Sequence, residues 1–116
     1  MNNYLAACFD VYYYKNYAKA CCIVFETGPP EKNISEYCKK ALPTKPYVPG
    51  EFYKRELPCI LAVYEIIQQE IDLIIIDGFV TLENGRKGLG VYLFEALNGK
   101  TPIIGVAKSP FKSIGD

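Results

Sequence analysis

The run Leu73-Ile74-Ile75-Ile76 is aliphatic at every position and has an aspartate on each side. A strand with one face in water alternates apolar and polar residues, whereas a strand buried on both faces is continuously aliphatic. The run therefore predicts a central, parallel strand that is covered on both faces. A second apolar run, over 102–107, predicts another buried strand. These two runs place the chain in the α/β class.

Two segments with helical periodicity accompany these strands. Five apolar side chains recur at i, i+3, i+4, i+7 and i+10 and form one face of a helix: Leu57, Ile60, Leu61, Tyr64 and Ile67. Pro58 suits the first turn of that helix. A second amphipathic pattern covers 89–97, and Asn98-Gly99 after it is typical of a helix C-cap. Both segments are expected to be helices that connect parallel strands.

The first forty residues have the pattern of a hairpin. Apolar and aromatic runs over 4–9 and 17–25 predict two strands, with a turn at Lys15-Asn16. The segment 34–42 fits either a short third strand or a helical turn, and a proline-rich loop follows over 43–50. The order of elements predicts a mixed sheet that starts with an antiparallel hairpin and continues as β-α-β-α-β.

Size, composition and charge restrict the class of protein. The 116 residues suffice for one domain over 1–116, and no window of about 18 apolar residues predicts a membrane span. No basic segment precedes a long apolar segment at the start, so we expect a soluble, cytoplasmic protein without a secretory signal. The 13 basic and 13 acidic residues cancel. Contact with nucleic acid would therefore need a local basic patch or bound metal ions.

The five cysteines are odd in number, include no C-x-x-C pair and have mostly apolar neighbours. We interpret them as buried, reduced thiols rather than as disulfides or metal ligands.

Charged residues follow the predicted strands, where ligands of α/β sheets bind. Asp10, Asp77 and Lys108 each stand just past an apolar strand, and Glu56 lies at the start of the first helix. Carboxylate oxygens suit Mg²⁺ or Mn²⁺, and such a metal assists phosphoryl transfer by activating water and neutralising charge on the phosphate. Lys108 could contact a phosphate as a point charge. Taken singly, each residue also fits a turn, a helix terminus or a solvated surface.

The proline-rich loop has a second feature besides its turns. Tyr47 stands between Pro46 and Pro49, and several basic residues surround the loop: Lys39, Lys40, Lys45, Lys54 and Arg55. A rigid aromatic residue in a basic region can stack on a nucleic-acid base or wedge between bases. The alternative is an ordinary loop stiffened by proline.

Four blocks of the sequence together resemble endonuclease V, a metal-dependent nuclease family that recognises deaminated adenine (inosine) in DNA or RNA. In chain order they are Phe9-Asp10-Val11-Tyr12-Tyr13, Pro46-Tyr47-Val48-Pro49-Gly50 with Arg55-Glu56, Ile76-Asp77-Gly78, and Gly105-Val106-Ala107-Lys108-Ser109. The resemblance implies an RNase H-like fold, in agreement with the element order. It also implies hydrolysis of a phosphodiester near inosine, with Mg²⁺ or Mn²⁺ as cofactor and a role in DNA repair.

The resemblance also implies roles for individual residues that match the family's functional positions. Asp10, Glu56 and Asp77 match the metal-binding carboxylates, and Lys108 matches the active-site lysine. The segment Pro46, Tyr47, Val48 and Pro49 matches the wedge that binds nucleic acid at the altered base, and Arg55 follows it.

The sequence also departs from the family pattern. It has no histidine, and Glu83-Asn84-Gly85-Arg86 stands where the family carries a histidine followed by Pro-Arg. The family pattern continues further, so the resemblance implies a chain that lacks the family's C-terminal portion. An alternative is therefore a catalytically inactive relative that binds nucleic acid or another protein, and a third is one domain of a longer chain. An exposed sheet edge also favours homo-oligomers.

Overall fold

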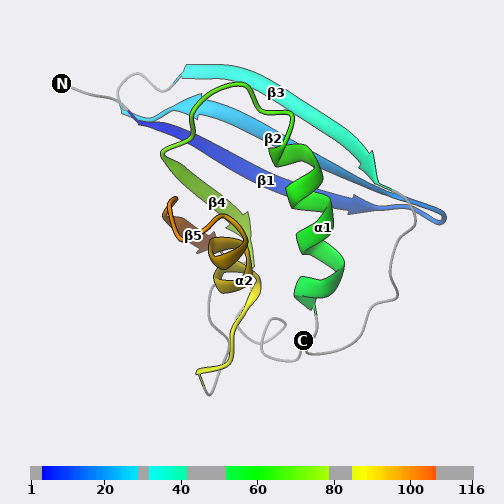
Figure 1. Ribbon diagram of the computed structural model, residues 1–116. Coiled ribbons are helices and arrows are strands. Elements are labelled where there is room, and N and C mark those ends of the chain that lie inside the picture. The colour runs from blue at the N-terminus through cyan, green and yellow to red at the C-terminus, as the bar shows by residue number, and fades with distance from the viewer. Residues whose placement is uncertain (1–3, 29–31, 42–51, 79–84, 107–116) are drawn as a thin grey trace.

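The computed structural model describes residues 4–28, 32–41, 52–78 and 85–106, and they form a mixed sheet with helices. In chain order the elements are β1 (Leu5–Tyr13), β2 (Ala18–Glu26), β3 (Lys32–Ala41), α1 (Phe52–Tyr64), β4 (Leu73–Asp77), α2 (Leu89–Ala96) and β5 (Ile103–Val106). The strands lie in the order β3-β2-β1-β4-β5 (Figure 1). This confirms the predicted α/β class with its antiparallel start.

The first three strands form an antiparallel meander. The β1–β2 register runs from Leu5 opposite Glu26 to Tyr13 opposite Ala18, and the Tyr14 amide donates to the Tyr17 carbonyl across the predicted turn, at 2.8 Å. The ambiguous segment after the second strand is the ten-residue strand β3.

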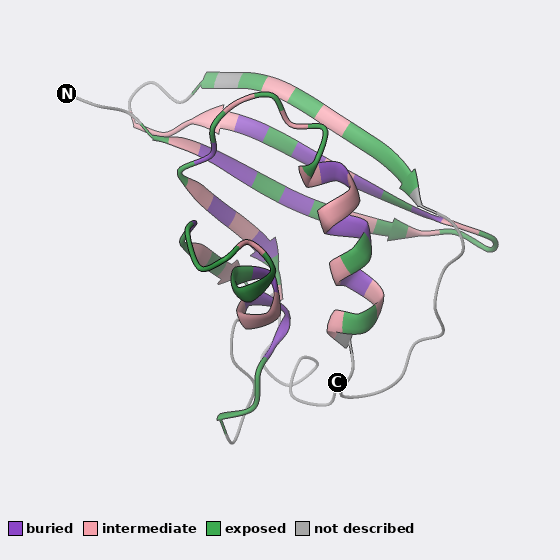
Figure 2. Cartoon of the chain, viewed as in Figure 1, coloured by how far each residue is buried: buried purple, intermediate pink, exposed green. Residues whose placement is uncertain are grey.

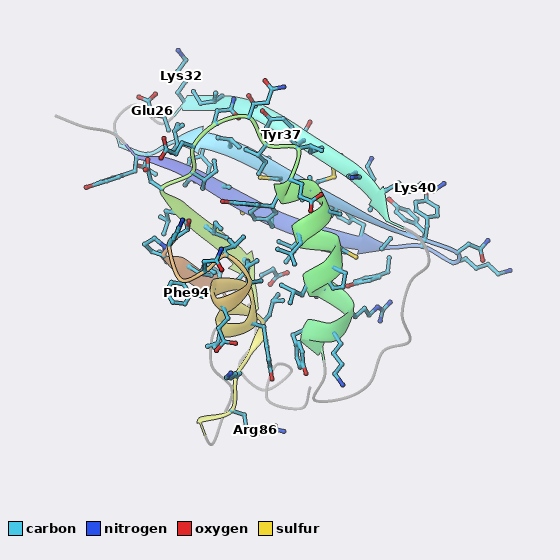
Figure 3. All side chains as sticks on the ribbon, viewed as in Figure 1. Glu26, Lys32, Tyr37, Lys40, Arg86 and Phe94 are labelled. Carbon is cyan, nitrogen blue, oxygen red and sulfur yellow. A yellow bond between two sulfur atoms is a disulfide. The ribbon has the colours of Figure 1, made fainter. Side chains whose placement is uncertain are left out.

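Tyr37 of β3 ties the antiparallel part of the sheet to the segment that follows α1 (Figure 3). Its hydroxyl donates to Gln69 Oε1 at 2.7 Å and accepts from the Gln68 amide at 3.3 Å. The strand is therefore held by a side-chain contact as well as by its pairing with β2.

β4 and β5 extend the sheet with parallel pairing, β4 beside β1 and β5 beside β4. Ile74 and Ile76 of the aliphatic run are buried at 0% and 1% exposure, as predicted. The prediction of burial on both faces was wrong: Leu73 and Ile75 of β4 are only half-buried. In β5, which was also predicted to be buried, Ile104 and Val106 are 49% and 52% exposed. The reason is that α1 and α2 lie over the same face of the sheet (Figure 1).

The core lies between that sheet face and the two helices. Buried residues alternate along β1, β2 and β4 and recur on the helix faces, as the purple bands of Figure 2 show. The largest fully buried side chains are Ile60, Ile74, Ile76, Leu93, Val24, Val63 and Cys22. No helix among the described residues is long and apolar enough to cross a membrane.

The ends of the helices partly match the sequence. The Gly99 amide donates to the Phe94 carbonyl at 2.8 Å, and Asn98 and Gly99 both have positive φ, which confirms the predicted end of α2. The expected start of the first helix was wrong. α1 begins at Phe52, so Pro58 lies inside it and Glu56 lies in the second turn. Pro58 is exposed, so the helix carries its ring on the solvent side, away from the core.

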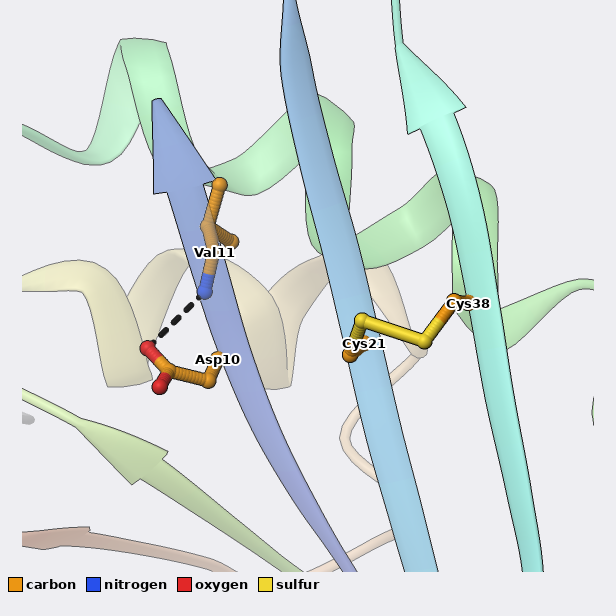
Figure 4. The surroundings of a disulfide bond; sticks show 4 residues. All are labelled: Asp10, Val11, Cys21 and Cys38. Carbon is orange, nitrogen blue, oxygen red and sulfur yellow. Dashed lines mark hydrogen bonds between the residues drawn. A yellow bond between two sulfur atoms is a disulfide. The ribbon is translucent and has the colours of Figure 1, made fainter. Parts of the chain in front are cut away.

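The expectation of five reduced thiols was also wrong. Cys21 and Cys38 form a disulfide, which crosses from β2 to β3 (Figure 4). The two residues are direct partners in the β2–β3 register. That pairing depends on the segment being a strand, which the sequence left open. Cys22 and Cys59 are buried free thiols, as expected, whereas the free thiol of Cys8 is exposed.

Truncating a buried side chain in the central strand β4 should lower the free energy of unfolding more than truncating an exposed one in β5. We expect Ile74→Ala to lower the free energy of unfolding by about 2–5 kcal/mol, because it leaves a cavity between the sheet and the helices. Ile104→Ala, the matched change on exposed β5, should cost about 0.5 kcal/mol or less. Urea unfolding followed by circular dichroism measures both. Equal losses in the two variants would contradict the assigned core.

Candidate metal centre

Asp10 and Asp77 lie where the pairing of β1 with β4 ends. The last described pair is Phe9 with Ile76, and each aspartate is the next residue on its strand. Both aspartates are exposed. The prediction that Asp10 follows its strand was wrong, since β1 continues to Tyr13 by pairing with β2. Asp10 nevertheless lies at the carboxyl end of the parallel β1–β4 pairing, and this part of the prediction agrees with the sheet topology.

Glu56 reaches the same region from α1, on the helix-covered side of the sheet. It is only 6% exposed, although it is a carboxylate. The hydroxyl of Tyr13, the last residue of β1, donates to Glu56 Oε2. The Arg55 guanidinium lies over the Tyr13 ring, with Cζ 3.7 Å from the ring centroid. A buried carboxylate is costly unless such groups accompany it.

The electrostatics relate the three carboxylates to one another. The pKa of Glu56 is raised from 4.5 to about 7: burial is the largest cause and the charges of Asp10 and Asp77 add to it, while the Tyr13 hydrogen bond and Arg55 oppose the rise. Like charges disfavour ionisation only when they are near. The charges of Asp10 and Asp77 therefore act on the buried Glu56 carboxylate.

Sequence reasoning missed two neighbours of these carboxylates. Burial raises the pKa of the Cys8 thiol, and so do the charges of Asp10 and Asp77. The charge of Asp10, and then its hydrogen bond, raise the pKa of Tyr12. Strand alternation was the available signal, because it places residues 8, 10 and 12 on one face and Tyr13 on the other.

The donor set has the chemistry of a site for a hard divalent cation. Three carboxylates supply the oxygen ligands that Mg²⁺ and Mn²⁺ prefer. Within the described ranges, no three histidine, cysteine or carboxylate side chains are grouped closely enough to hold a metal ion. One oxygen of Asp10, Oδ1, accepts from the Val11 amide at 3.0 Å (Figure 4). The carboxylates thus fit the cation by type and share its region, but they are not assembled as a cage.

Of the remaining predicted residues, the structure describes only Arg55. Arg55, predicted to contact nucleic acid, lies half-buried against Tyr13. Pro46, Tyr47, Val48, Pro49 and Lys108 lie outside the described residues.

Comparison with known proteins identifies the family. The sequence model of the family described as Endonuclease V matches residues 2–115. The chain belongs to the Endonuclease V family. This match includes the positions of all the predicted site residues.

Solved structures of Endonuclease V share the fold. The protein from Streptomyces avermitilis superposes with a TM-score of 0.81 and 31% identity, over 92% of this chain and 46% of that one. A variant from Ciona intestinalis, in complex with a 23-mer DNA containing an inosine followed by a ribo-adenosine, gives 0.80 and 25% over 92% and 46%. The Bacillus subtilis protein gives 0.69 and 22% over 94% and 46%, which is evidence for the fold alone. The chain thus spans about half the length of these relatives.

The raised pKa of Glu56 predicts a pH-dependent stability. The folded state binds the Glu56 proton more tightly than the unfolded state, so stability should fall as pH rises from about 4.5 to about 7. The pKa difference corresponds to a loss of about 3 kcal/mol. Glu56→Gln should remove this part of the pH dependence and exceed the wild type in stability at pH 8. Urea unfolding of metal-free protein at pH 5 and pH 8 measures it.

Glu65→Gln is the matched control, since it makes the same change at an exposed carboxylate just after α1. It should keep the wild-type pH dependence. A Glu56→Gln protein whose stability varies with pH as the wild type does would show that Glu56 is not the group responsible.

Proposed function

We propose that this chain is a metal-dependent endonuclease that hydrolyses a phosphodiester near inosine in DNA or RNA. What supports the proposal is that Asp10 and Asp77 follow the last pair of the β1–β4 pairing and that their charges act on the buried Glu56 carboxylate. Membership of the Endonuclease V family supports the reaction class, and the inosine-containing DNA bound by the Ciona intestinalis relative supports the ligand.

The proposed roles divide between metal binding and nucleic-acid binding. Asp10, Glu56 and Asp77 would hold Mg²⁺ or Mn²⁺, and the bound ion would supply an activated water and neutralise charge on the phosphate. The proposed contact of Lys108 with the phosphate rests on its position in the matching motif. Arg55 and the segment Pro46–Pro49 would contact the nucleic acid, with Tyr47 as the aromatic wedge.

A purely structural role does not explain this arrangement. Burial of Glu56 disfavours its charged form, and the two nearby aspartates disfavour it further. A fold selected for stability alone gains nothing from aspartate charges that oppose the ionisation of a buried glutamate. A divalent cation reverses the sign of that interaction, because it attracts all three carboxylates.

A second candidate function is binding without catalysis. The chain has no histidine, and the described residues contain no group ready to hold a metal. An inactive relative would keep nucleic-acid or protein binding but would not cleave.

Location and assembly belong to the proposal as well. We place the protein in the cytoplasm, with a role in DNA repair. Self-association would use a sheet edge, and β3 is poorly suited to it because Lys32, Glu36, Lys39 and Lys40 are exposed along that strand. Pairing through β5 is therefore the proposed mode, and analytical ultracentrifugation reports it.

Loss of Asp77 should abolish cleavage. We expect Asp77→Asn to lose activity on a labelled inosine-containing oligonucleotide in Mg²⁺ or Mn²⁺, whether the substrate is DNA or RNA, single- or double-stranded. The same change should raise the unfolding temperature of metal-free protein, because it removes one of two neighbouring anions. Gel analysis of cleavage products and differential scanning fluorimetry provide the measurements.

Asp72→Asn is the matched control at the other end of β4. The Asp72 side chain accepts from the Leu5 amide at 2.9 Å, and asparagine keeps an acceptor oxygen there. This variant should cleave as the wild type does. Cleavage by Asp77→Asn at the wild-type rate would overturn the assignment of the site. Binding without cleavage by the wild type would favour the second candidate function.

Truncation of Tyr47 should weaken binding of the altered base. We expect Tyr47→Ala to reduce affinity for inosine-containing oligonucleotides by about 1–3 kcal/mol, with little change in stability, because base stacking on the ring is lost. Fluorescence anisotropy measures the affinity. Tyr4→Ala, which removes a ring that is 62% exposed, is the control and should bind normally. Unchanged affinity in Tyr47→Ala would leave the loop with a structural role only.

A further inference from the structure

A row of three exposed side chains crosses the sheet near the β1–β2 turn, on the face opposite the helices. Tyr12 of β1 is the register partner of Lys19 in β2, and Lys19 is the register partner of Lys40 in β3. Side chains alternate between the two faces of a strand, so this row shares its face with Asp10, two residues before Tyr12. The row therefore adjoins the candidate metal centre.

Within the row, two lysines stand directly opposite each other. Like charges in such a cross-strand pair destabilise a sheet. No carboxylate of a described residue forms an ion pair with Lys19 or Lys40. Lys40 Nζ instead lies 4.4 Å from the centroid of the Tyr17 ring. The repulsion between the two ammonium groups would be relieved by an anion bound across them.

The turn beside this row carries an exposed aromatic ring that is already held in place. Tyr14 is 49% exposed and stacks on Tyr17, with ring centroids 4.7 Å apart and ring planes 18° apart. Its amide also donates to the Tyr17 carbonyl at 2.8 Å, which closes the turn around the exposed Lys15. A ring that is ordered before binding loses little side-chain freedom when a base stacks on it.

The charge at this end of the sheet is positive, although the whole chain is neutral. Residues 11–25 and 37–41 contain no acidic residue and four lysines: Lys15, Lys19, Lys39 and Lys40. Figure 1 shows the β1–β2 turn beside the end of β3, past α1, and Figure 3 shows Lys40 at that end. The acidic neighbours are Asp10 and Glu36, whose charges raise the pKa of Tyr12. They limit the basic region on the side of the candidate metal centre.

We propose that the β1–β2 turn and the end of β3 form a binding surface for single-stranded nucleic acid, with Lys15, Lys19 and Lys40 on its phosphates and the Tyr14 ring on a base. We call these four residues the hairpin-end surface. Lysines beside exposed aromatic rings bind single strands with little sequence preference, because every nucleotide has a phosphate and a flat base. The inference takes its partner class from the proposed function, but it requires neither inosine nor a metal ion.

Binding of a fluorescent oligothymidylate to the full chain in EDTA tests the surface. This probe has no inosine, and EDTA removes divalent ions, so neither recognition of the altered base nor cleavage contributes. Fluorescence anisotropy gives Kd at several salt concentrations for the wild type and for Lys19→Gln/Lys40→Gln. Lys32→Gln/Lys100→Gln is the matched control, because it removes the same charge at exposed positions at the start of β3 and after α2.

The lysine pair should determine both the affinity and its dependence on salt. We expect Lys19→Gln/Lys40→Gln to weaken binding roughly tenfold or more at low salt. The slope of log affinity against log salt should fall by about 1.4, since each phosphate contact on a single strand contributes about 0.7. The control should keep the wild-type slope. Thermal unfolding should show Lys19→Gln/Lys40→Gln to be no less stable than the wild type, because it removes a like-charge pair.

The aromatic contact is tested by changes at Tyr14. We expect Tyr14→Ala to weaken binding of the oligothymidylate roughly 5–150-fold, because stacking on one base is lost. Tyr14→Phe keeps the ring and should bind as the wild type does. Tyr4→Ala removes a ring that is 62% exposed just before β1 and should also bind normally. A duplex with oligodeoxyadenylate should respond less to Tyr14→Ala, because its bases are already stacked.

Several outcomes would overturn the inference. Equal losses of affinity in the two lysine variants would show an effect of net charge rather than of this surface. An equal effect of Tyr14→Ala on single strand and duplex would remove the stacking contact. Displacement of the oligothymidylate by polyglutamate as readily as by unlabelled oligothymidylate would identify an acidic protein as the better partner.

Failure of this inference is distinct from failure of the proposed function. A wild type that cleaves inosine-containing oligonucleotides, while both lysine variants bind the oligothymidylate equally well, would lose only the hairpin-end surface. A wild type that binds the oligothymidylate through Lys19 and Lys40 but cleaves nothing in Mg²⁺ or Mn²⁺ would keep the surface and lose the nuclease activity.

Discussion

The parallel pairing of β1 with β4 is the interaction on which the rest of this structure depends. Four residue pairs, from Ala6 with Leu73 to Phe9 with Ile76, join the antiparallel meander to the parallel part of the sheet. The side chains of Phe9, Ile74 and Ile76 are buried beneath the helices, so hydrophobic burial holds the two strands in that register. Because the pairing ends after Phe9 and Ile76, Asp10 and Asp77 emerge from it together. One packing constraint thereby produces both the core and the aspartate pair.

Glu56 connects this core to the site. Its burial shifts its pKa to about 7, so the folded chain holds a carboxylate whose ionisation near neutral pH opposes folding. The Tyr13 hydroxyl and the Arg55 guanidinium favour its charged form, and a bound divalent cation would favour it far more. An ionised Glu56 therefore makes the folded protein less stable than a neutral side chain at this position would. Such arrangements are common where function requires charge in a buried place.

The solved relatives show how much of the Endonuclease V fold this chain contains. About 92% of this chain aligns with 46% of the Streptomyces avermitilis protein at a TM-score of 0.81, and the family match covers residues 2–115. The described residues leave apolar side chains exposed on the sheet face opposite the helices, among them Ile23, Ile104 and Val106. Asp10 and Asp77 are exposed as well, so the aspartate pair is accessible from solvent in the described structure.

The sequence by itself determined the elements whose signal is local. The aliphatic run at 73–76, the helical period from Leu57 and the Asn98-Gly99 terminus each reflect the residue's own backbone preference or the burial of one face. The structure confirms a strand, a helix and a helix end there, although α1 begins at Phe52 and ends at Tyr64, before Ile67. The sequence also indicated Asp10 and Asp77 beside predicted strand ends and Glu56 near the start of the first predicted helix, because those positions can be read from the order of the residues. Only the tertiary structure decided that 32–41 is a strand, that Cys21 faces Cys38, and that Tyr13 holds a buried Glu56. These features arise between residues far apart in the chain. Their energies depend on which strand lies beside which, and no local propensity contains that information.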